Sequence, residues 1–199
     1  MGRLQPLLRV ELDWDDDLVT HYWRDGYAIV RGLFDPDEMA EISAAVDQVH
    51  DEAAAHGRSF RHGNLFYNVA RHDDGLPMVR MAQWMSRHQP VLNGVRLDRR
   101  IAAVLEPLIG RNLKQIINQL HWKAPSSLSD FAWHQDSRFR QPEHAFRNLG
   151  SAYVQTGLAI DPHTPESGCM RFIPRSHSHG SLKLDETIEV LGTAMSDAV

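Results

Sequence analysis

A histidine and a carboxylate two residues apart, at His134 and Asp136, give this chain its clearest candidate for chemistry. On a β-strand, residues i and i+2 point to the same face, so both side chains can reach one metal ion. Two histidines and one carboxylate on one side of Fe(II) leave three coordination positions open for co-substrate and oxygen. The pair fits two of these three protein ligands. A core histidine paired with its neighbour is the alternative interpretation.

Context, rather than spacing, distinguishes this pair from similar ones. The chain has 12 histidines and 26 acidic residues, for which about 1.6 such pairs are expected by chance. The pair His50–Glu52 falls in a predicted helix, where positions i and i+2 diverge. The pair His72–Asp74 precedes a glycine in a predicted turn. Only His134–Asp136 ends an aromatic, strand-like run.

Hydrophobic periodicity and capping signals place most helices before most strands. Helices are predicted over residues 15–24, 35–57 and 97–108. Strands are predicted over residues 27–30, 115–123, 131–136, 152–160 and 169–174, with a turn at 161–168. Residues 58–88 are expected to be loop with at most one short strand. This order favours an α+β, mainly β fold around an antiparallel sheet.

The composition indicates one soluble globular domain over residues 1–199. With 21 basic and 26 acidic side chains the formal charge is −5, which gives no general attraction for nucleic acid or anionic lipid. No apolar run approaches the roughly 20 residues of a membrane span. The single Cys169 excludes an intramolecular disulfide and suits a reducing compartment. We therefore expect a cytoplasmic protein with neither a nucleic-acid nor a membrane partner; the oligomeric state is not indicated.

Several motifs, taken in order, resemble a known family. They are His21-Tyr22-Trp23-Arg24-Asp25-Gly26-Tyr27, Trp133-His134-Gln135-Asp136-Ser137, Gly157-Leu158-Ala159-Ile160-Asp161 and the run from Glu166 to His177. Over about residues 17–180 the sequence resembles the phytanoyl-CoA dioxygenase family, whose members are Fe(II)/2-oxoglutarate oxygenases. The resemblance implies a double-stranded β-helix, or jelly roll, with the N-terminal helices packed on the sheet.

The resemblance also implies site residues and a reaction. His134 and Asp136 would be the first two iron ligands, and Gln119, Lys123 and Gly157 would border the 2-oxoglutarate pocket. Gln119 and Lys123 share one strand face, and an amide and an ammonium suit carboxylate oxygens. An ordinary strand-end lysine and a simple bulge at the glycine are the structural alternatives. The implied reaction hydroxylates an unactivated carbon of a small organic molecule with O2, while 2-oxoglutarate is decarboxylated to succinate.

The last part of the sequence departs from the family pattern. The family's third iron-binding histidine and the arginine that pairs with 2-oxoglutarate lie on late strands, and no histidine follows His179. Structural or surface roles are expected for His177 and His179, unless a rearranged turn brings one to the metal. Arg175 stands where the family usually has glycine. We therefore expect a C-terminally incomplete jelly roll, either from an oxygenase completed by further sequence or from a truncated or pseudo-enzyme member that acts as a non-catalytic binding protein.

Overall fold

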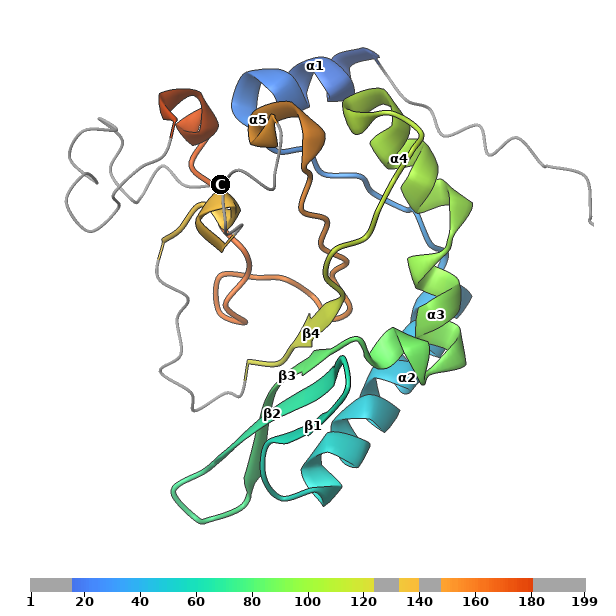
Figure 1. The fold of residues 1–199 in the computed structure, drawn as a ribbon, viewed down its shortest axis with the longest axis vertical. Coiled ribbons are helices and arrows are strands. Elements are labelled where there is room, and N and C mark those ends of the chain that lie inside the picture. Colours follow the sequence, from blue (N-terminus) through green and yellow to red (C-terminus); the bar gives the residue numbers. More distant parts are fainter. Residues whose placement is uncertain (1–15, 124–132, 140–147, 181–199) are drawn as a thin grey trace, which may run out of the picture.

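The computed structural model describes residues 16–123, 133–139 and 148–180. The helices of these residues are α1 (Asp16–Asp25), α2 (Pro36–Ala55), α3 (Pro90–Arg96), α4 (Arg99–Ile109) and α5 (Leu149–Ala152), with the 3-10 helices η1 (Met85–Arg87), η2 (Asp136–Phe139) and η4 (Ser176–His179). Helices α1, α2 and α4 confirm the three predicted helices, whereas α3 was not predicted. Figure 1 shows α1 and α5 at one end of the long axis and the sheet with α2 toward the other.

Helix α2 begins where the sequence predicts because its first turn is capped by its own residues. The Glu38 N–H donates to Asp35 Oδ1 at 2.8 Å, and the Asp35 N–H donates to Glu38 Oε2 at 2.9 Å. Pro36 occupies the first turn, where its missing N–H needs no partner. The helix packs on the sheet through a buried face that carries Ile42, Ala45, Val46, Val49 and Ala53.

The strands form one antiparallel sheet in the order β1 (Phe60–His62), β2 (Leu65–Arg71), β3 (Pro77–Gln83) and β4 (Gln119–His121). Along β2, Leu65, Tyr67 and Val69 alternate into the core beside the α2 face. The prediction of a loop over 58–88 was wrong. The alternation in β2 is short, and the surrounding His, Arg, Asn and Gly residues favour loops when they are considered without a pairing partner.

The second half of the described chain forms fewer strands than predicted. Strand β4 confirms the centre of the strand predicted over 115–123, and a turn lies within 161–168. Strand predictions were wrong at the described positions of 27–30, 131–136, 152–160 and 169–174, where the backbone belongs to no strand and is in part helical. Extended backbone becomes a strand only where a neighbour completes its hydrogen bonds. The antiparallel sheet is thus observed, and the jelly roll remains a prediction.

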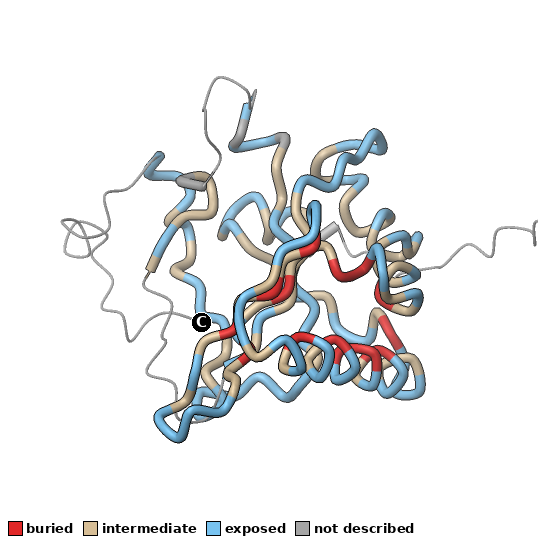
Figure 2. Tube along the Cα trace, turned by 60° about the horizontal axis from the view of Figure 1, so that its bottom comes forward, coloured by how far each residue is buried: buried red, intermediate tan, exposed pale blue. Residues whose placement is uncertain are grey.

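The buried apolar side chains of the described residues all belong to the stretch from Phe34 to Leu92. Figure 2 shows that they follow α2 and the sheet. Later residues such as Ile101, Leu120, Trp122 and Ile160 are only partly buried and pack against this core from outside. The segment from residue 34 to residue 92, called the scaffold below, therefore has a core of its own, against which the later segments pack.

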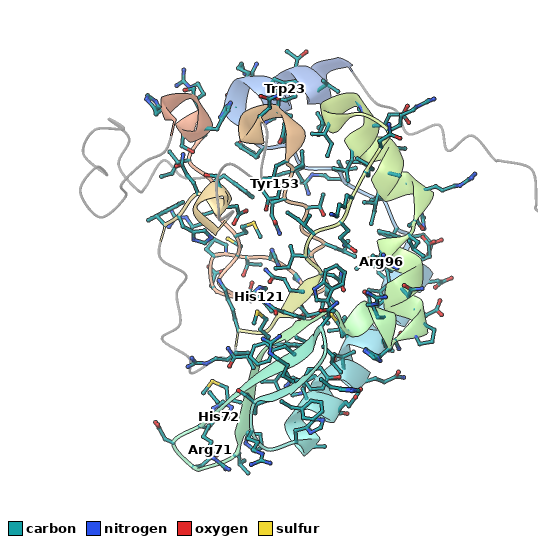
Figure 3. All side chains as sticks on the ribbon, viewed as in Figure 1. Trp23, Arg71, His72, Arg96, His121 and Tyr153 are labelled. Carbon is teal, nitrogen blue, oxygen red and sulfur yellow. The ribbon has the colours of Figure 1, made fainter. Side chains whose placement is uncertain are left out.

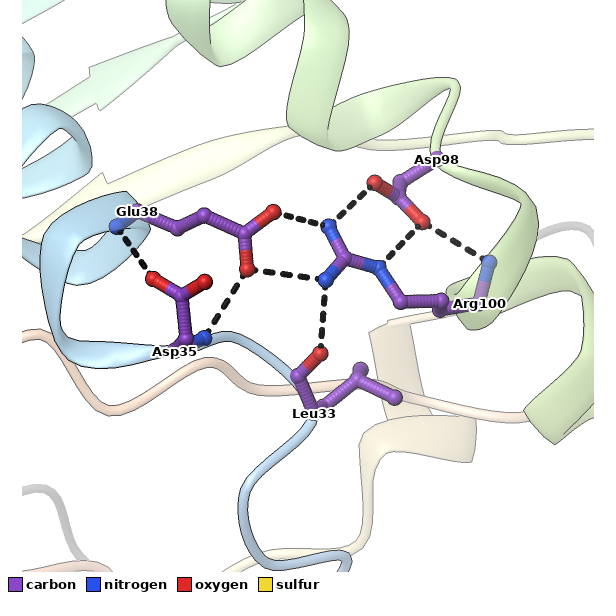
Figure 4. A network of polar contacts seen from close by, with 5 residues as sticks. All are labelled: Leu33, Asp35, Glu38, Asp98 and Arg100. Carbon is purple, nitrogen blue, oxygen red and sulfur yellow. Dashed lines mark hydrogen bonds and ion pairs between the residues drawn. The ribbon is translucent and has the colours of Figure 1, made fainter. Parts of the chain in front are cut away.

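The beginnings of α2 and α4 are joined by the side chain of Arg100 (Figure 4). Its guanidinium donates to both oxygens of Glu38 at 2.7 and 2.8 Å, and to Asp98 at 2.8 and 3.0 Å. It also donates to the Leu33 carbonyl at 3.0 Å and lies 4.4 Å from the centroid of the Phe34 ring. The hydrogen bonds from Arg100 lower the pKa of Glu38 and that of Asp98. These charge-assisted bonds fix the position of α4 relative to the core.

Candidate metal and co-substrate site

His134 and Asp136 lie close together even though their segment is not a strand. His134 Nε2 and Asp136 Oδ1 are 3.5 Å apart. Two donors that each lie about 2.0–2.2 Å from one metal ion can be at most about 4.4 Å apart, so this pair fits a shared ion. The two side chains are 29% and 40% exposed, which keeps them accessible. No group of three or more His, Cys, Asp or Glu side chains with metal-binding geometry occurs in the described ranges.

A pocket of about 110 Å³ lies beside His134. The segment that carries this histidine forms one wall, and the end of α1 with the residues before and within η4 forms the other. The rings of Tyr27 and Phe172 stack with their centroids 5.1 Å apart and their planes 9° from parallel. The Arg171 guanidinium lies 5.9 Å from the centroid of the Trp133 ring. The pocket is therefore small, and aromatic rings line much of it.

The part of the pocket wall that η4 and the residue before it form is joined to the end of α1 by two hydrogen bonds. The Arg175 N–H donates to the Asp25 carbonyl at 2.8 Å, and His177 Nε2 lies 3.1 Å from the Trp23 carbonyl oxygen. Because a carbonyl only accepts, Nε2 carries the proton in this contact. Gly26 has a φ of +86°, and a Cβ there would overlap the His177 ring, so glycine permits the approach. His177 thus joins η4 to the end of α1.

The turn into η4 begins at a strained residue. Arg175 has a φ of +64°, in the left-handed region that glycine occupies without steric cost. Both the N–H and the hydroxyl of Ser178 donate to the Arg175 carbonyl, at 3.0 and 2.7 Å. The turn therefore keeps the shape for which a glycine is suited, although an arginine stands at this position.

Asp25, at the end of α1, is an acidic group of the pocket wall that the sequence did not reveal. Arg24 approaches its carboxylate to 2.6 Å and His21 Nδ1 to 3.1 Å. The hydrogen bond from Arg24 lowers the pKa of Asp25, and the charges of Arg24, His21 and Arg175 act in the same direction. The only signal was its place in the opening motif, which does not say that Asp25 and His134 line the same pocket.

The other predicted site residues do not line the pocket beside His134 among the residues with described positions. Gln119 is half-buried in β4. Lys123 Nζ donates a short hydrogen bond to the carbonyl of Gly168. Gly157 approaches Met170, whose Cε would lie 3.6 Å from an added Cβ, an ordinary contact. The structure brings His134 and Asp136 together, and a co-substrate role for the other three residues stays a prediction.

Comparisons with known proteins identify the family to which the chain belongs. A family model described as Phytanoyl-CoA dioxygenase (PhyH) matches residues 22–189. The chain belongs to this family, which confirms the resemblance drawn from its motifs.

Curated relatives of the chain are named as dioxygenases. An ectoine dioxygenase of Stutzerimonas stutzeri is 22% identical over 163 residues, which cover 82% of this chain and 50% of that protein. An ectoine dioxygenase of Sphingopyxis alaskensis is 24% identical over 181 residues, 88% and 55% of the two chains. The dioxygenase lolE1 of Epichloe uncinata is 22% identical over 163 residues, 80% and 57%. The chain thus spans about half the length of the curated relatives it matches.

Within the described ranges, no helix has the length and hydropathy of a membrane span.

Proposed function

We propose that this protein is an Fe(II)- and 2-oxoglutarate-dependent oxygenase that hydroxylates an unactivated carbon of a small organic molecule. The proposal is carried by the 3.5 Å approach of His134 Nε2 to Asp136 Oδ1 within a chain of a dioxygenase family. Relatives named ectoine dioxygenase support a small molecule as the substrate. Its identity is not assigned.

His134 and Asp136 are the proposed iron donors, through the imidazole Nε2 and a carboxylate oxygen. Both groups bind metal only when deprotonated, so iron binding releases protons and weakens in acid. Iron together with 2-oxoglutarate, when bound, supplies the oxidising chemistry: O2 is consumed, 2-oxoglutarate becomes succinate and CO2, and one oxygen atom enters the substrate. The part of the chain itself is to hold, orient and shield these groups.

Gln119, Lys123 and Gly157 are the proposed co-substrate residues. The Lys123 ammonium would pair with a carboxylate, while the Gln119 amide would donate a hydrogen bond and the glycine would leave space. Because Lys123 is bonded to the Gly168 carbonyl, co-substrate binding would replace a neutral acceptor with a charged one, which makes the stronger hydrogen bond. We therefore expect the turn at Gly168 to lose this contact when 2-oxoglutarate binds.

The aromatic pocket beside His134 is the proposed position of the substrate. The stacked rings of Tyr27 and Phe172 and the Trp133 ring provide apolar walls that exclude water next to His134. The ionised Asp25 carboxylate is the negative group of the same wall. A molecule with an apolar body would therefore be held with one of its carbons toward His134.

A non-catalytic binding protein is the second candidate. Two observations favour it. The described residues bring two metal donors together rather than three, and Lys123 is hydrogen-bonded to a carbonyl of its own chain. A member of the family with an incomplete metal site would still offer its aromatic pocket to a small ligand. The candidates differ in whether iron and 2-oxoglutarate bind together.

An anaerobic titration of the protein with Fe(II) and 2-oxoglutarate separates the two candidates. Chelation of 2-oxoglutarate to iron produces a visible charge-transfer band, which we expect in the wild type and not in His134→Ala. The matched control is His72→Ala, because His72 also begins a His-x-Asp pair but lies by the β2–β3 connection, at the far end of the molecule from Trp23 (Figure 3). This control should keep the band.

Each outcome decides between defined alternatives. The absence of a band in a wild-type sample with native circular dichroism would reject the iron and 2-oxoglutarate proposal and leave the binding protein. A band that persists in His134→Ala would show iron binding at other residues and would contradict the proposed donors.

A further inference from the structure

A second pocket, of about 180 Å³, lies where α2, β2 and the connection from η1 to α3 meet. Its floor consists of the buried side chains of Val49, Tyr67 and Met85, which are 1–3% exposed. Its mouth is polar and includes the exposed residues Glu52 and His88. None of these residues lines the pocket beside the proposed iron donors, and Figure 1 shows α2 and β2 well apart from α1.

The charge at this second pocket is negative. Glu52 is the carboxylate among its lining residues, and no lysine or arginine of the described residues lines it. Burial raises the pKa of Tyr67, and the nearby charge of Glu52 raises it further. The Tyr67 phenol therefore stays protonated at neutral pH and adds no second negative charge to the pocket. The pocket thus combines a carboxylate at its mouth with an apolar floor.

Hydrogen bonds within the protein fix the positions of the residues at the rim of the pocket. Gln89 Oε1 accepts from the N–H groups of Val91 and Leu92, at 2.7 and 3.3 Å, and so caps α3. Its Nε2 donates to Gln48 Oε1 at 3.0 Å, which joins α3 to α2 across the rim. Because these polar groups are already engaged, the rim is pre-organised for a ligand.

We propose that this pocket binds a small organic cation, namely an ammonium or amidinium group on a short hydrocarbon chain. The charge pairs with Glu52, the hydrocarbon covers the floor, and a cation near the face of the Tyr67 ring gains a further attraction. An anionic ligand would be repelled by the Glu52 carboxylate, and none of the described lining residues is a lysine or arginine that could pair with it. A metal ion would find one carboxylate and one histidine, too few donors for a protein site. Since a cavity of about 150 Å³ holds benzene, this pocket admits a ligand of similar size.

The proposal is independent of iron and 2-oxoglutarate, and it is tested with n-butylammonium and 1-butanol, which differ in charge and little in size. Titrations followed by ¹H–¹⁵N NMR should show saturable shifts of the Met85 and Gln89 amides. We expect the ammonium to bind at least threefold more tightly than the alcohol. Glu52→Gln should remove this preference, whereas Glu41→Gln, an exposed glutamate on the same helix outside the pocket, should retain it.

The role of charge is also tested without any substitution. Raising the NaCl concentration screens an exposed carboxylate, so the affinity for n-butylammonium should fall while that for 1-butanol does not. Equal affinities for the two probes, shifts that do not saturate at these amides, or a preference that survives Glu52→Gln would each overturn the proposal.

Discussion

Replacing Gly26 by alanine should loosen the contact between α1 and η4 that forms one wall of the pocket beside His134. The φ of +86° at Gly26 makes an alanine there less favourable by about 1–2 kcal/mol. The new Cβ would also overlap the His177 ring, which must then move and lose its hydrogen bond to the Trp23 carbonyl. An exposed bond of this kind contributes about 0.5–1 kcal/mol. We therefore expect a local loss of about 1.5–3 kcal/mol.

The Arg175 amide reports on this contact because its N–H donates to the Asp25 carbonyl. The expected loss corresponds to a fall in hydrogen-exchange protection of about 10- to 150-fold. In a His177→Ala background the ring is gone, so Gly26→Ala should show only the backbone effect, and the two substitutions should be less than additive by about 0.5–1 kcal/mol. Gly32→Ala is the matched control, because Gly32 has a φ of +67° but nothing within 4 Å of an added Cβ. It should leave the protection of Arg175 unchanged.

Two results would refute this reasoning. Strictly additive effects of Gly26→Ala and His177→Ala would show that the methyl group and the ring do not compete for one space. Unchanged protection of the Arg175 amide in Gly26→Ala would show that glycine is not what permits the contact.

Arg100→Met should lower the urea midpoint at neutral pH, because Glu38 and Asp98 lose the hydrogen bonds that depress their pKa values. Depressed folded-state values stabilise the protein above the ordinary values of 4.5 and 3.8, and this stabilisation is lost as the pH falls through the folded-state values. The fall in the urea midpoint caused by Arg100→Met should therefore be smaller in acid. An equal fall at pH 7 and pH 3 would show that the depressed carboxylate pKa values are not its cause. Leu92→Ala, in the core and 7% exposed, should lower the free energy of unfolding by about 2–5 kcal/mol. Leu97→Ala, at 62% exposed, should change it by less than about 0.5 kcal/mol, and similar losses in the two variants would argue against the observed core.

Helices were predictable because their signals are local. The spacing of Asp35 and Glu38, with Pro36 between them, specifies the capped start of α2 before any tertiary contact is known. The hairpins of β1, β2 and β3 were missed although Leu65, Tyr67 and Val69 alternate. The identity of the partner strand, which no local pattern contains, decides whether such a short alternation becomes sheet.

In the candidate site, too, local features were predictable from the sequence and long-range contacts were not. The sequence singled out His134 and Asp136 as neighbours on a strand; they lie 3.5 Å apart, but in a segment that is not a strand, so the residues were predictable and the backbone that positions them was not. The contact between His177 and the Trp23 carbonyl joins positions 154 residues apart, and nothing in either segment points to the other. Lys123 was singled out for its chemistry, but tertiary structure decides whether its ammonium contacts Gly168 or a ligand.

Among the described residues, the buried apolar side chains are confined to the stretch between Phe34 and Leu92, and this confinement also bears on the order of events during synthesis. At about 5–20 residues per second, this stretch is complete roughly 2–8 s before His134 is added to the chain. Its strands β1 to β3 are sequential neighbours, and contacts between nearby residues form quickly. The scaffold can therefore assemble while the proposed iron donors are still being made, and these donors then fold against a surface that already exists.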